Sequence, residues 1–348
     1  MIRAAIVGMG WWGKTLVESV ADSDRIRCVA GATRARTPDL ERFAGAQRLR
    51  LLDGFEAALA DPDVDAIVLA TPHSTHTRQV VAAAAAGKHV FCEKPFALTR
   101  ADAEQAVSAM RQAGRTLGLG YNRRFHPEMT RLRDQIRSGE LGTILHAEAT
   151  MCVPNGLLLK PDAWRANREE TPCGGLTPLG VHAIDAMIDL CGPIDEVYCQ
   201  SFRRAVSVDS DDTTSVLFRM TAGMSGYLGT MMATGPGFSF QIYGSKGWVR
   251  LEGMTHVAGA SSEERRTRLF GTCRFQPVKG DAQVWQATTL DIVKTSLEAF
   301  ADAAEGRAPF PIPLDEMIHG VAVTEAVVRS AQMHAIVPVE STASALAV

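Results

Sequence analysis

A glycine-rich turn, Gly8-Met9-Gly10-Trp11-Trp12-Gly13, separates an apolar, β-branched segment at residues 2–7 from a helical pattern that begins near Lys14. Glycines at this spacing between a strand and a helix are typical of a dinucleotide-binding βαβ unit. The first glycine permits the tight turn, the second leaves room for a pyrophosphate against the backbone, and the third lets the helix pack closely on the strand. The turn therefore predicts phosphate binding at a helix N-terminus. A glycine turn without a ligand is the alternative.

The first 122 residues alternate between apolar strand patterns and helical patterns. Predicted strands span residues 2–7, 26–30, 66–70, 89–92 and 117–120, and predicted helices span residues 14–21, 40–44, 55–60, 75–86 and 100–113. Near-continuous apolar strands joined by helices are typical of a parallel sheet that is covered on both faces. We therefore expect an α/β fold with an N-terminal Rossmann domain, a doubly wound parallel sheet, at residues 1–122.

The rest of the chain, residues 123–348, reads as a second domain. A chain of 348 residues exceeds the size of one ordinary core. Strand patterns predominate, and they predict a large, mainly antiparallel open sheet in an α/β domain. We expect a loop at residues 260–268, helices at residues 291–304 and 315–333, and a fraying tail at residues 341–348. The helix at 315–333 is expected to pack back toward the first domain.

Composition excludes several classes of function. The formal net charge of −3 gives no basic surface for nucleic acid or an anionic membrane. No segment approaches the ~18 uninterrupted apolar residues of a membrane helix, and the N-terminus does not read as a signal peptide. The seven cysteines are scattered, without a CxxC pair, which fits free thiols in a reducing compartment and predicts no metal site. We expect a soluble, cytoplasmic protein.

The end of the second predicted strand bears on the choice between NAD and NADP. An acidic residue there would accept hydrogen bonds from the ribose hydroxyls of NAD. This chain has Thr33 instead, followed by Arg34 and Arg36. Arginine forks bind a 2′-phosphate well, so NADP is favoured as the cofactor. The alternative is that these arginines are solvated loop charges and that the protein takes NAD as well.

Two further segments follow predicted strands at the sheet edge where open α/β sheets bind ligands. The first is Ala70-Thr71-Pro72-His73-Ser74-Thr75-His76, and the second is Phe91-Cys92-Glu93-Lys94-Pro95. Oxidising an alcohol carbon requires its hydroxyl to lose a proton, and Lys94 beside a positively charged nicotinamide is suited to accept it. We assign Thr71, Pro72, His73, His76 and Glu93 to cofactor binding, and Lys94 to both cofactor binding and catalysis. An exposed lysine before a proline turn is the alternative.

A second constellation lies in residues 173–185. A Cys-Gly-Gly loop leads into a predicted helix in which Thr177 is suited to cap the N-terminus and Pro178 to occupy the first turn. His182 and Asp185 are three residues apart and are therefore neighbours on the helix surface. This pair is a candidate proton relay, although a single histidine in a helix can equally be structural.

These motifs occur in an order that resembles the Gfo/Idh/MocA oxidoreductase family. The resemblance rests on the glycine turn, Glu93-Lys94-Pro95, Tyr121-Asn122-Arg123-Arg124-Phe125, Trp164-Arg165 and Gly180-Val181-His182-Ala183-Ile184-Asp185. It extends over the full chain. It implies a hydride transfer between a nicotinamide and a hydroxyl or keto carbon of a sugar, cyclitol or related polyol, and a homodimer or homotetramer formed through the open sheet.

The same resemblance assigns roles to single residues. The catalytic lysine of the family corresponds to Lys94 and the motif histidine to His182, with Asp185 as its orienting partner. We place Arg123, Trp164, Arg165 and His182 on the substrate side, with inter-domain salt bridging as the alternative for the arginines. The acidic residue that the family usually has four positions before the histidine is Pro178 here.

That departure leaves rival functions open. The resemblance also covers glycosidases that use tightly held NAD to oxidise a sugar transiently, and a catalytically silent NADP-binding regulator would also carry these motifs. Release of NADPH would separate a dehydrogenase from the glycosidases, and loss of activity in Lys94→Ala with cofactor binding retained would count against the regulator.

Overall fold

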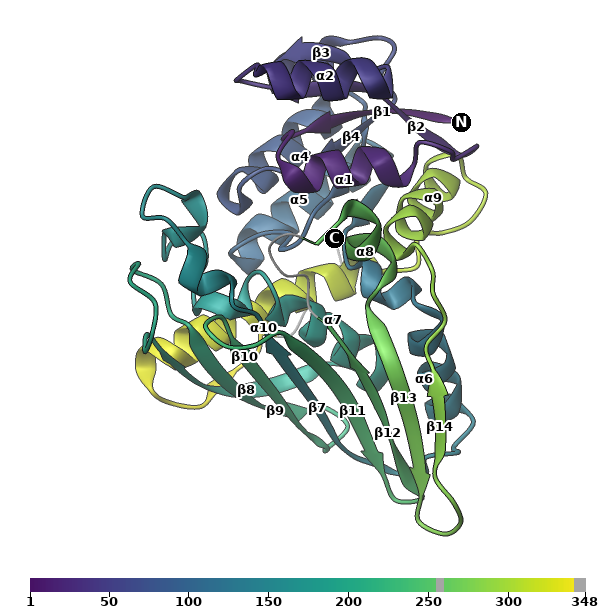
Figure 1. The fold of residues 1–348 in the computed structure, drawn as a ribbon, viewed down its shortest axis with the longest axis vertical. Helices are drawn as coiled ribbons and strands as arrows, with labels where there is room; N and C mark the ends of the chain where they lie inside the picture. The colour runs from purple at the N-terminus through teal and green to yellow at the C-terminus, as the bar shows by residue number, and fades with distance from the viewer. Residues whose placement is uncertain (255–259, 341–348) are drawn as a thin grey trace. The chain divides into compact units, whose positions relative to one another are not determined.

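The computed structural model describes residues 1–254 and 260–340, which divide into two compact units (Figure 1). Unit 1 contains Met1–Asn122 and Asp291–Ile318, and unit 2 contains Arg123–Leu290 and the chain from His319 onward. Among the described residues, no helix is long and apolar enough to cross a membrane.

Unit 1 is built on a six-stranded sheet in the order β3-β2-β1-β4-β5-β6. Every neighbouring pair in this sheet is parallel, which is the doubly wound Rossmann topology. The strands are β1 (Ile2–Val7), β2 (Ile26–Thr33), β3 (Arg50–Asp53), β4 (Ala66–Leu69), β5 (His89–Cys92) and β6 (Leu117–Leu119).

The unit 1 helices keep the sheet out of water. They are α1 (Trp11–Ser19), α2 (Pro38–Gln47), α3 (Phe55–Ala60), α4 (His76–Ala85), α5 (Arg100–Gln112) and α9 (Ile292–Ala304). One core cluster joins Ile6 of β1 with Leu16 of α1 and Phe300 of α9. Phe300 also packs edge-to-face on Phe91 of β5, with ring centroids 5.6 Å apart. Burial of this apolar face explains why α9, although late in the chain, belongs to unit 1.

Unit 2 contains a nine-stranded sheet in the order β14-β13-β12-β11-β7-β10-β9-β8-β15 (Figure 1). Strands β7 and β10 are parallel, and all other neighbouring pairs in this sheet are antiparallel. The strands are β7 (Ile144–Cys152), β8 (Ile194–Phe202), β9 (Thr213–Met220), β10 (Ser225–Met231), β11 (Gly237–Gly244), β12 (Gly247–Gly253), β13 (Phe270–Pro277), β14 (Gln283–Gln286) and β15 (Val337–Pro338).

The remaining helices are α6 (Pro127–Arg137), α7 (Gly180–Cys191), α8 (Ser262–Thr267) and α10 (Leu314–Met333). Helix α7 packs against β7 and β10. Its side chains are buried almost all round, including Val181, Ile184 and Ile188 of the predicted core face. A helix that is buried on every side holds its polar residues in fixed positions. This applies to His182 and Asp185, which lie near the start of α7.

The predicted Rossmann sheet and mainly antiparallel second sheet are confirmed, but two local features differ from the predictions. Strand β3 was not among the strands expected in the first domain; it has only four residues, too few to show a periodicity. The predicted loop at residues 260–268 contains α8, because a capping box between Ser261 and Glu264 stabilises its start. The predicted fraying tail lies outside the described residues.

Two other corrections concern helix ends and the domain division. Thr177 does not cap α7, because the helix begins at Gly180 and the Thr177 hydroxyl donates to the Pro172 carbonyl at 3.0 Å. Residues 123–348 were predicted as one domain, whereas Asp291–Ile318 belongs to unit 1. Helix α9 carries apolar residues that complete the unit 1 core. Helix α10 begins in unit 1 and continues in unit 2, and its predicted packing toward the first domain stays a prediction.

Candidate functional site

The turn between β1 and α1 has the geometry that a dinucleotide requires. A β-carbon on Gly8, whose φ is +98°, would lie 2.4 Å from the Ala70 carbonyl oxygen, and one on Gly13 would lie 2.1 Å from the Gly8 carbonyl oxygen. Both positions therefore require glycine. At Gly10, by contrast, a β-carbon would meet no described atom within 4 Å. The backbone is open to solvent there and can be approached closely.

The start of α1 has no side-chain cap. Gly10 is the N-cap residue, no side chain caps the helix, and its first turn contains no acidic residue. The first backbone N–H groups of a helix have no partner within the helix and favour an anion. Trp11 is half-exposed beside this turn and Trp12 packs edge-to-face on it at 5.4 Å. The residues present fit a dinucleotide pyrophosphate.

The end of β2 separates the two predicted phosphate-binding arginines. Arg36 donates to the Asp53 carboxylate at 2.6 Å and to the Leu51 carbonyl at 3.1 Å. The Thr33 hydroxyl donates to the Ala35 carbonyl. Arg34 is exposed and makes no hydrogen bond or ion pair with any residue in 1–254 or 260–340. Arg34 is therefore the arginine available to an external anion.

The segment after β4 forms a network around Thr71. The Thr71 hydroxyl donates to the Gln79 side chain at 2.6 Å and accepts from Thr75 at 3.0 Å. His76 is fully buried, with Nδ1 2.9 Å from the Pro95 carbonyl and Nε2 3.1 Å from the Thr71 carbonyl. His76 thus ties the loop after β4 to the loop after β5, whereas it was predicted to bind cofactor itself. His73 is buried next to it, with ring centroids 6.0 Å apart.

Glu93 and Lys94 follow β5 directly, at the same carboxyl edge as the glycine turn. Glu93 is buried, and its carboxylate lies so close to Gly120 that a β-carbon there would come within 2.8 Å of it. Burial raises the pKa of Glu93, against the opposing effects of the Lys94 ammonium and the Trp12 indole. The Lys94 backbone N–H donates to Glu93 Oε2 at 3.3 Å, and its side chain is only partly buried. This hydrogen bond holds the Lys94 backbone beside the Glu93 carboxylate.

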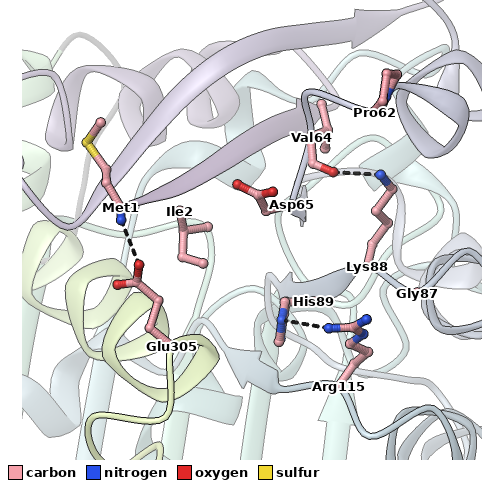
Figure 2. Close-up of a pocket in the computed structure, with 10 residues that line it drawn as sticks. All are labelled: Met1, Ile2, Pro62, Val64, Asp65, Gly87, Lys88, His89, Arg115 and Glu305. Carbon is pink, nitrogen blue, oxygen red and sulfur yellow. Dashed lines mark hydrogen bonds and ion pairs between the residues drawn. The ribbon is translucent and has the colours of Figure 1, made fainter.

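A polar cavity of about 420 Å³ lies at the opposite edge of this sheet (Figure 2). Its lining includes Ile2 at the start of β1, His89 at the start of β5 and Arg115 just before β6. These are the amino ends of the strands, whereas dinucleotides bind beyond the carboxyl ends. Lys88 in this cavity already donates to two backbone carbonyls, those of Asp61 and Val64. The cavity is separate from the dinucleotide site.

In unit 2, the loop before α7 is held against the ends of β9 and β10. The Thr214 hydroxyl donates to the Cys173 carbonyl at 2.8 Å. A β-carbon on Gly174, whose φ is +50°, would lie 1.8 Å from the Asp211 carbonyl oxygen, so only glycine fits. His182 follows in the first turn of α7 and is buried. Pro178, which was predicted to occupy the first turn of this helix, lies before its start at Gly180 and supplies no carboxylate.

Asp185 forms a buried ion pair with Arg124. Arg124 Nη2 and Nε lie 2.7 Å and 3.0 Å from Asp185 Oδ1, and Nε is 2.9 Å from Oδ2. Both side chains are 4% exposed. Arg124 also lies 3.5 Å from Asp189, which pairs with Arg133 at 2.5 Å. Arg124 already neutralises the charge of Asp185. The predicted role of Asp185 as an orienting partner of His182 stays a prediction.

The predicted substrate-side arginines have different surroundings. The Arg165 guanidinium stacks on the Trp164 ring at 4.1 Å, and burial lowers the pKa of Arg165. Arg123 is buried and lies over the Phe238 ring at 4.5 Å. Arg123 was predicted from the sequence but Phe238 was not, because a phenylalanine within a strand pattern is expected to lie in the hydrophobic core. It also did not predict the Arg124–Asp185 pair.

Comparisons with known proteins agree with this geometry. Residues 2–121 match the family described as "Oxidoreductase family, NAD-binding Rossmann fold", of the Gfo/Idh/MocA group, and residues 129–250 match the "GFO/IDH/MocA C-terminal domain". Together the two matches cover most of the chain.

Three known proteins illustrate the similarity. The chain is 28% identical to the rhizopine catabolism protein MocA of Rhizobium meliloti, over 93% of each protein. It is 39% identical to an inositol 2-dehydrogenase of Rhodococcus erythropolis over 44% of this chain and 46% of that protein. Its fold is similar to the crystal structure of an aldose-aldose oxidoreductase from Caulobacter crescentus, with a TM-score of 0.83, 23% identity, and coverage of 97% of this chain and 99% of that one.

Proposed function

The chain belongs to the Gfo/Idh/MocA family of NAD(P)-dependent oxidoreductases, and we propose that it is an NADP-preferring dehydrogenase or reductase of a sugar, cyclitol or related polyol. The observation that carries this proposal is the open backbone at Gly10 on an uncapped helix, at the same sheet edge as Lys94. An anion site and a proton-transferring amine at one edge are what hydride transfer to or from an alcohol requires.

The chain's own residues would hold the cofactor from several sides. The α1 backbone N–H groups at Trp11 and Trp12 bind the pyrophosphate, and Arg34 binds the 2′-phosphate. When bound, the nicotinamide accepts or donates the hydride. Arg34 supports NADP because it is exposed and no described side chain competes for it, whereas Arg36 is already paired with Asp53. A charge-assisted contact to a phosphate is stronger than one to a neutral ribose hydroxyl.

Lys94 and His182 are the proposed proton-transfer residues. Lys94 Nζ removes the proton of the reacting hydroxyl during oxidation and returns it during reduction. The Lys94 backbone N–H donates to Glu93, and His76 contacts the carbonyl of the next residue, Pro95. The Lys94 side chain therefore extends from a fixed backbone position. His182 lies in a buried helix turn and is the second proton-transfer candidate. Because Pro178 replaces an acid, His182 works without a carboxylate one turn before it.

The substrate class is supported by the relatives. An inositol 2-dehydrogenase shares 39% identity over part of the chain, and an aldose-aldose oxidoreductase shares the fold. Cyclitols and aldoses both present a secondary or anomeric hydroxyl that can be oxidised with loss of one proton. We therefore extend the proposal to hydroxyl or keto carbons of such compounds.

Calorimetric titration with NADP and NAD, followed by a polyol and aldose panel read at the nicotinamide absorbance band, tests the proposal. We expect tighter NADP binding and turnover. Lys94→Met should abolish turnover but leave cofactor binding measurable, because the α1 backbone and Arg34 would still hold the phosphates. Lys279→Met, at an exposed lysine, should leave both unchanged. Binding of cofactor without any net NADPH release or consumption would argue for the glycosidase or regulator instead. Absence of cofactor binding would refute the proposal.

A further inference from the structure

The cavity at the amino edge of the unit 1 sheet has two carboxylates in its lining, and both are already neutralised. Asp65 accepts from Arg3 through both oxygens, with Oδ2 3.0 Å from Nε and Oδ1 2.8 Å from Nη2. Glu305 pairs with the Met1 amine at 2.6 Å and also with Arg307. Neither carboxylate is therefore the ion-pair partner of the lysine or the arginine in the same lining.

Lys88 and Arg115 bring two positive charges to this cavity. Neither side chain forms an ion pair with a carboxylate of the described residues. Lys88 Nζ donates to the Asp61 carbonyl at 2.9 Å and to the Val64 carbonyl at 2.6 Å, which leaves one of its three N–H groups. The Arg115 guanidinium makes no hydrogen bond to an oxygen atom of the described residues. Both cations therefore have N–H groups that are available to a ligand.

His89 contributes a third donor to the lining. The Thr116 backbone N–H donates to His89 Nδ1 at 3.1 Å, so the proton of the neutral ring is on Nε2. Burial and the Arg115 charge lower the pKa of His89, against the opposing effect of Asp65, and the ring is therefore neutral at pH 7. Nε2 lies 3.5 Å from Arg115 Nη1 (Figure 2). Two N–H donors thus face each other, and neither can accept a hydrogen bond from the other.

The topology of the sheet brings these three side chains together. Lys88 precedes His89, the first residue of β5, and Arg115 lies two residues before β6, which is the parallel neighbour of β5. A β-carbon on Gly87 would lie 3.7 Å from Arg115 Nη2, so the guanidinium lies beside the turn that precedes Lys88. The cavity has a volume of about 420 Å³, within the range of roughly 300–1,000 Å³ that is usual for small-molecule sites.

We propose that this cavity binds a phosphate dianion, either free phosphate or the phosphate group of a small monoester, at a site separate from the dinucleotide turn. A dianion neutralises both uncompensated charges, whereas a single carboxylate neutralises one. The phosphate oxygens accept from the Arg115 fork, from Lys88 and from His89 Nε2. The glycine turn lies at the opposite, carboxyl edge of the same sheet. The inference does not depend on the proposed hydride transfer.

Calorimetric titration of the full-length protein tests the assignment. The protein carries no N-terminal tag, because Met1 lines the cavity, and the buffer contains no phosphate or sulfate. The titration is made near about pH 8, where a phosphate monoester is a dianion. The probes are phenyl phosphate, inorganic phosphate and benzenesulfonate, a tetrahedral monoanion of similar size. None of them has an alcohol that a dehydrogenase could oxidise. Each probe is titrated with and without saturating NADP.

We expect both phosphates to bind whether or not NADP is present, and benzenesulfonate to bind at least about tenfold more weakly because it carries one charge. Tighter binding of phenyl phosphate than of inorganic phosphate supports a monoester as the ligand, and equal binding supports free phosphate. Absence of phosphate binding overturns the inference. So does equal binding of benzenesulfonate, and so does a site that NADP occupies.

Variants at an exposed position locate the bound anion. Arg115→Met should weaken phosphate binding about 10- to 100-fold, the range for a charge-assisted contact. Arg115→Lys, which keeps the charge but loses the fork, should weaken it less. Arg111→Met is the matched control, because Arg111 is an exposed arginine on α5 that does not line the cavity. An unchanged Kd in Arg115→Met overturns the inference, as does an equal loss in Arg111→Met.

The imidazole of His89 gives a second measurement at the site itself. In proton–nitrogen correlation spectra of the histidine rings, the signals that disappear in His89→Asn belong to His89. We expect the Nε2 signal to shift as phosphate is added and to saturate with the Kd that calorimetry gives. Arg115→Met should remove this shift. A His89 signal that stays unchanged while phosphate binds would place the anion elsewhere and overturn the inference.

Discussion

Replacing Asp185 with Asn should destabilise unit 2 strongly, because the substitution leaves Arg124 charged and buried. Both side chains are 4% exposed and make three contacts of 2.7–3.0 Å. Removing one partner of such a pair costs about 3–5 kcal/mol. Asp189 remains 3.5 Å from Arg124 but is already paired with Arg133, so it can offset only part of the loss. We therefore expect about 3 kcal/mol for Asp185→Asn.

Urea unfolding and calorimetry measure this cost. For a domain of about 200 residues, 3 kcal/mol corresponds to a fall in Tm of roughly 6–12 °C. The double variant Arg124→Met with Asp185→Leu removes both charges, and it should regain at least half of the loss. Arg219→Met, in an ion pair on the surface where Arg219 is 56% exposed, should cost less than about 1 kcal/mol. A cost below about 1 kcal/mol for Asp185→Asn would refute the reasoning, as would a double variant that is no more stable than the sum of the single changes predicts.

Three further predictions concern the cofactor turn, the cofactor preference and pH. Gly13→Ala places a β-carbon 2.1 Å from a backbone oxygen and should weaken NADP binding at least tenfold, which a calorimetric Kd equal to the wild-type value would contradict. Thr33→Asp with Arg34→Ala should shift the ratio of NADP to NAD affinity toward NAD, and an unchanged ratio would remove the assignment of Arg34. Burial lowers the pKa of His126 to about 4, below the ~6.5 of a free histidine. The unfolded chain therefore binds more protons between these values, and this group lowers stability by about 2 kcal/mol from pH 7 to pH 5. His126→Asn keeps a side-chain acceptor for the start of α6 and should remove that loss; equal pH dependence of the unfolding free energy in both proteins would count against it.

The candidate site was predictable where short-range rules operate. The glycine turn requires particular residues because of clashes between atoms that are close in sequence, and the helix that follows is marked by its apolar periodicity. Lys94 was a candidate because it follows a buried strand, and His182 was a candidate because it lies near the start of a buried helix. These signals depend on a few neighbouring residues, so they can be read from the sequence alone, and the roles of Lys94 and His182 stay proposals.

Predictions were less accurate where distant segments decide the outcome. The role of His76 as a tie between two loops depends on the Pro95 carbonyl, 19 residues away. The placement of α9 in unit 1 depends on a core whose other residues lie about 200 or more positions earlier. Helix α8 is a different case. Its capping box between Ser261 and Glu264 is a local signal that can be read from the sequence.

The class of fold and the glycine turn could be predicted from the amino-acid sequence, which also identified Lys94 and His182 as candidates for proton transfer. Which buried charges have a partner could be seen in the tertiary structure alone. Arg123 and Arg124 are adjacent and identical in chemistry, and no local pattern distinguishes them. Asp185, 61 residues away, pairs with Arg124, while Arg123 lies over Phe238 and has no acidic partner among the described residues. Charge compensation in a protein interior depends on which segments the fold brings together, and that is a property of the whole chain.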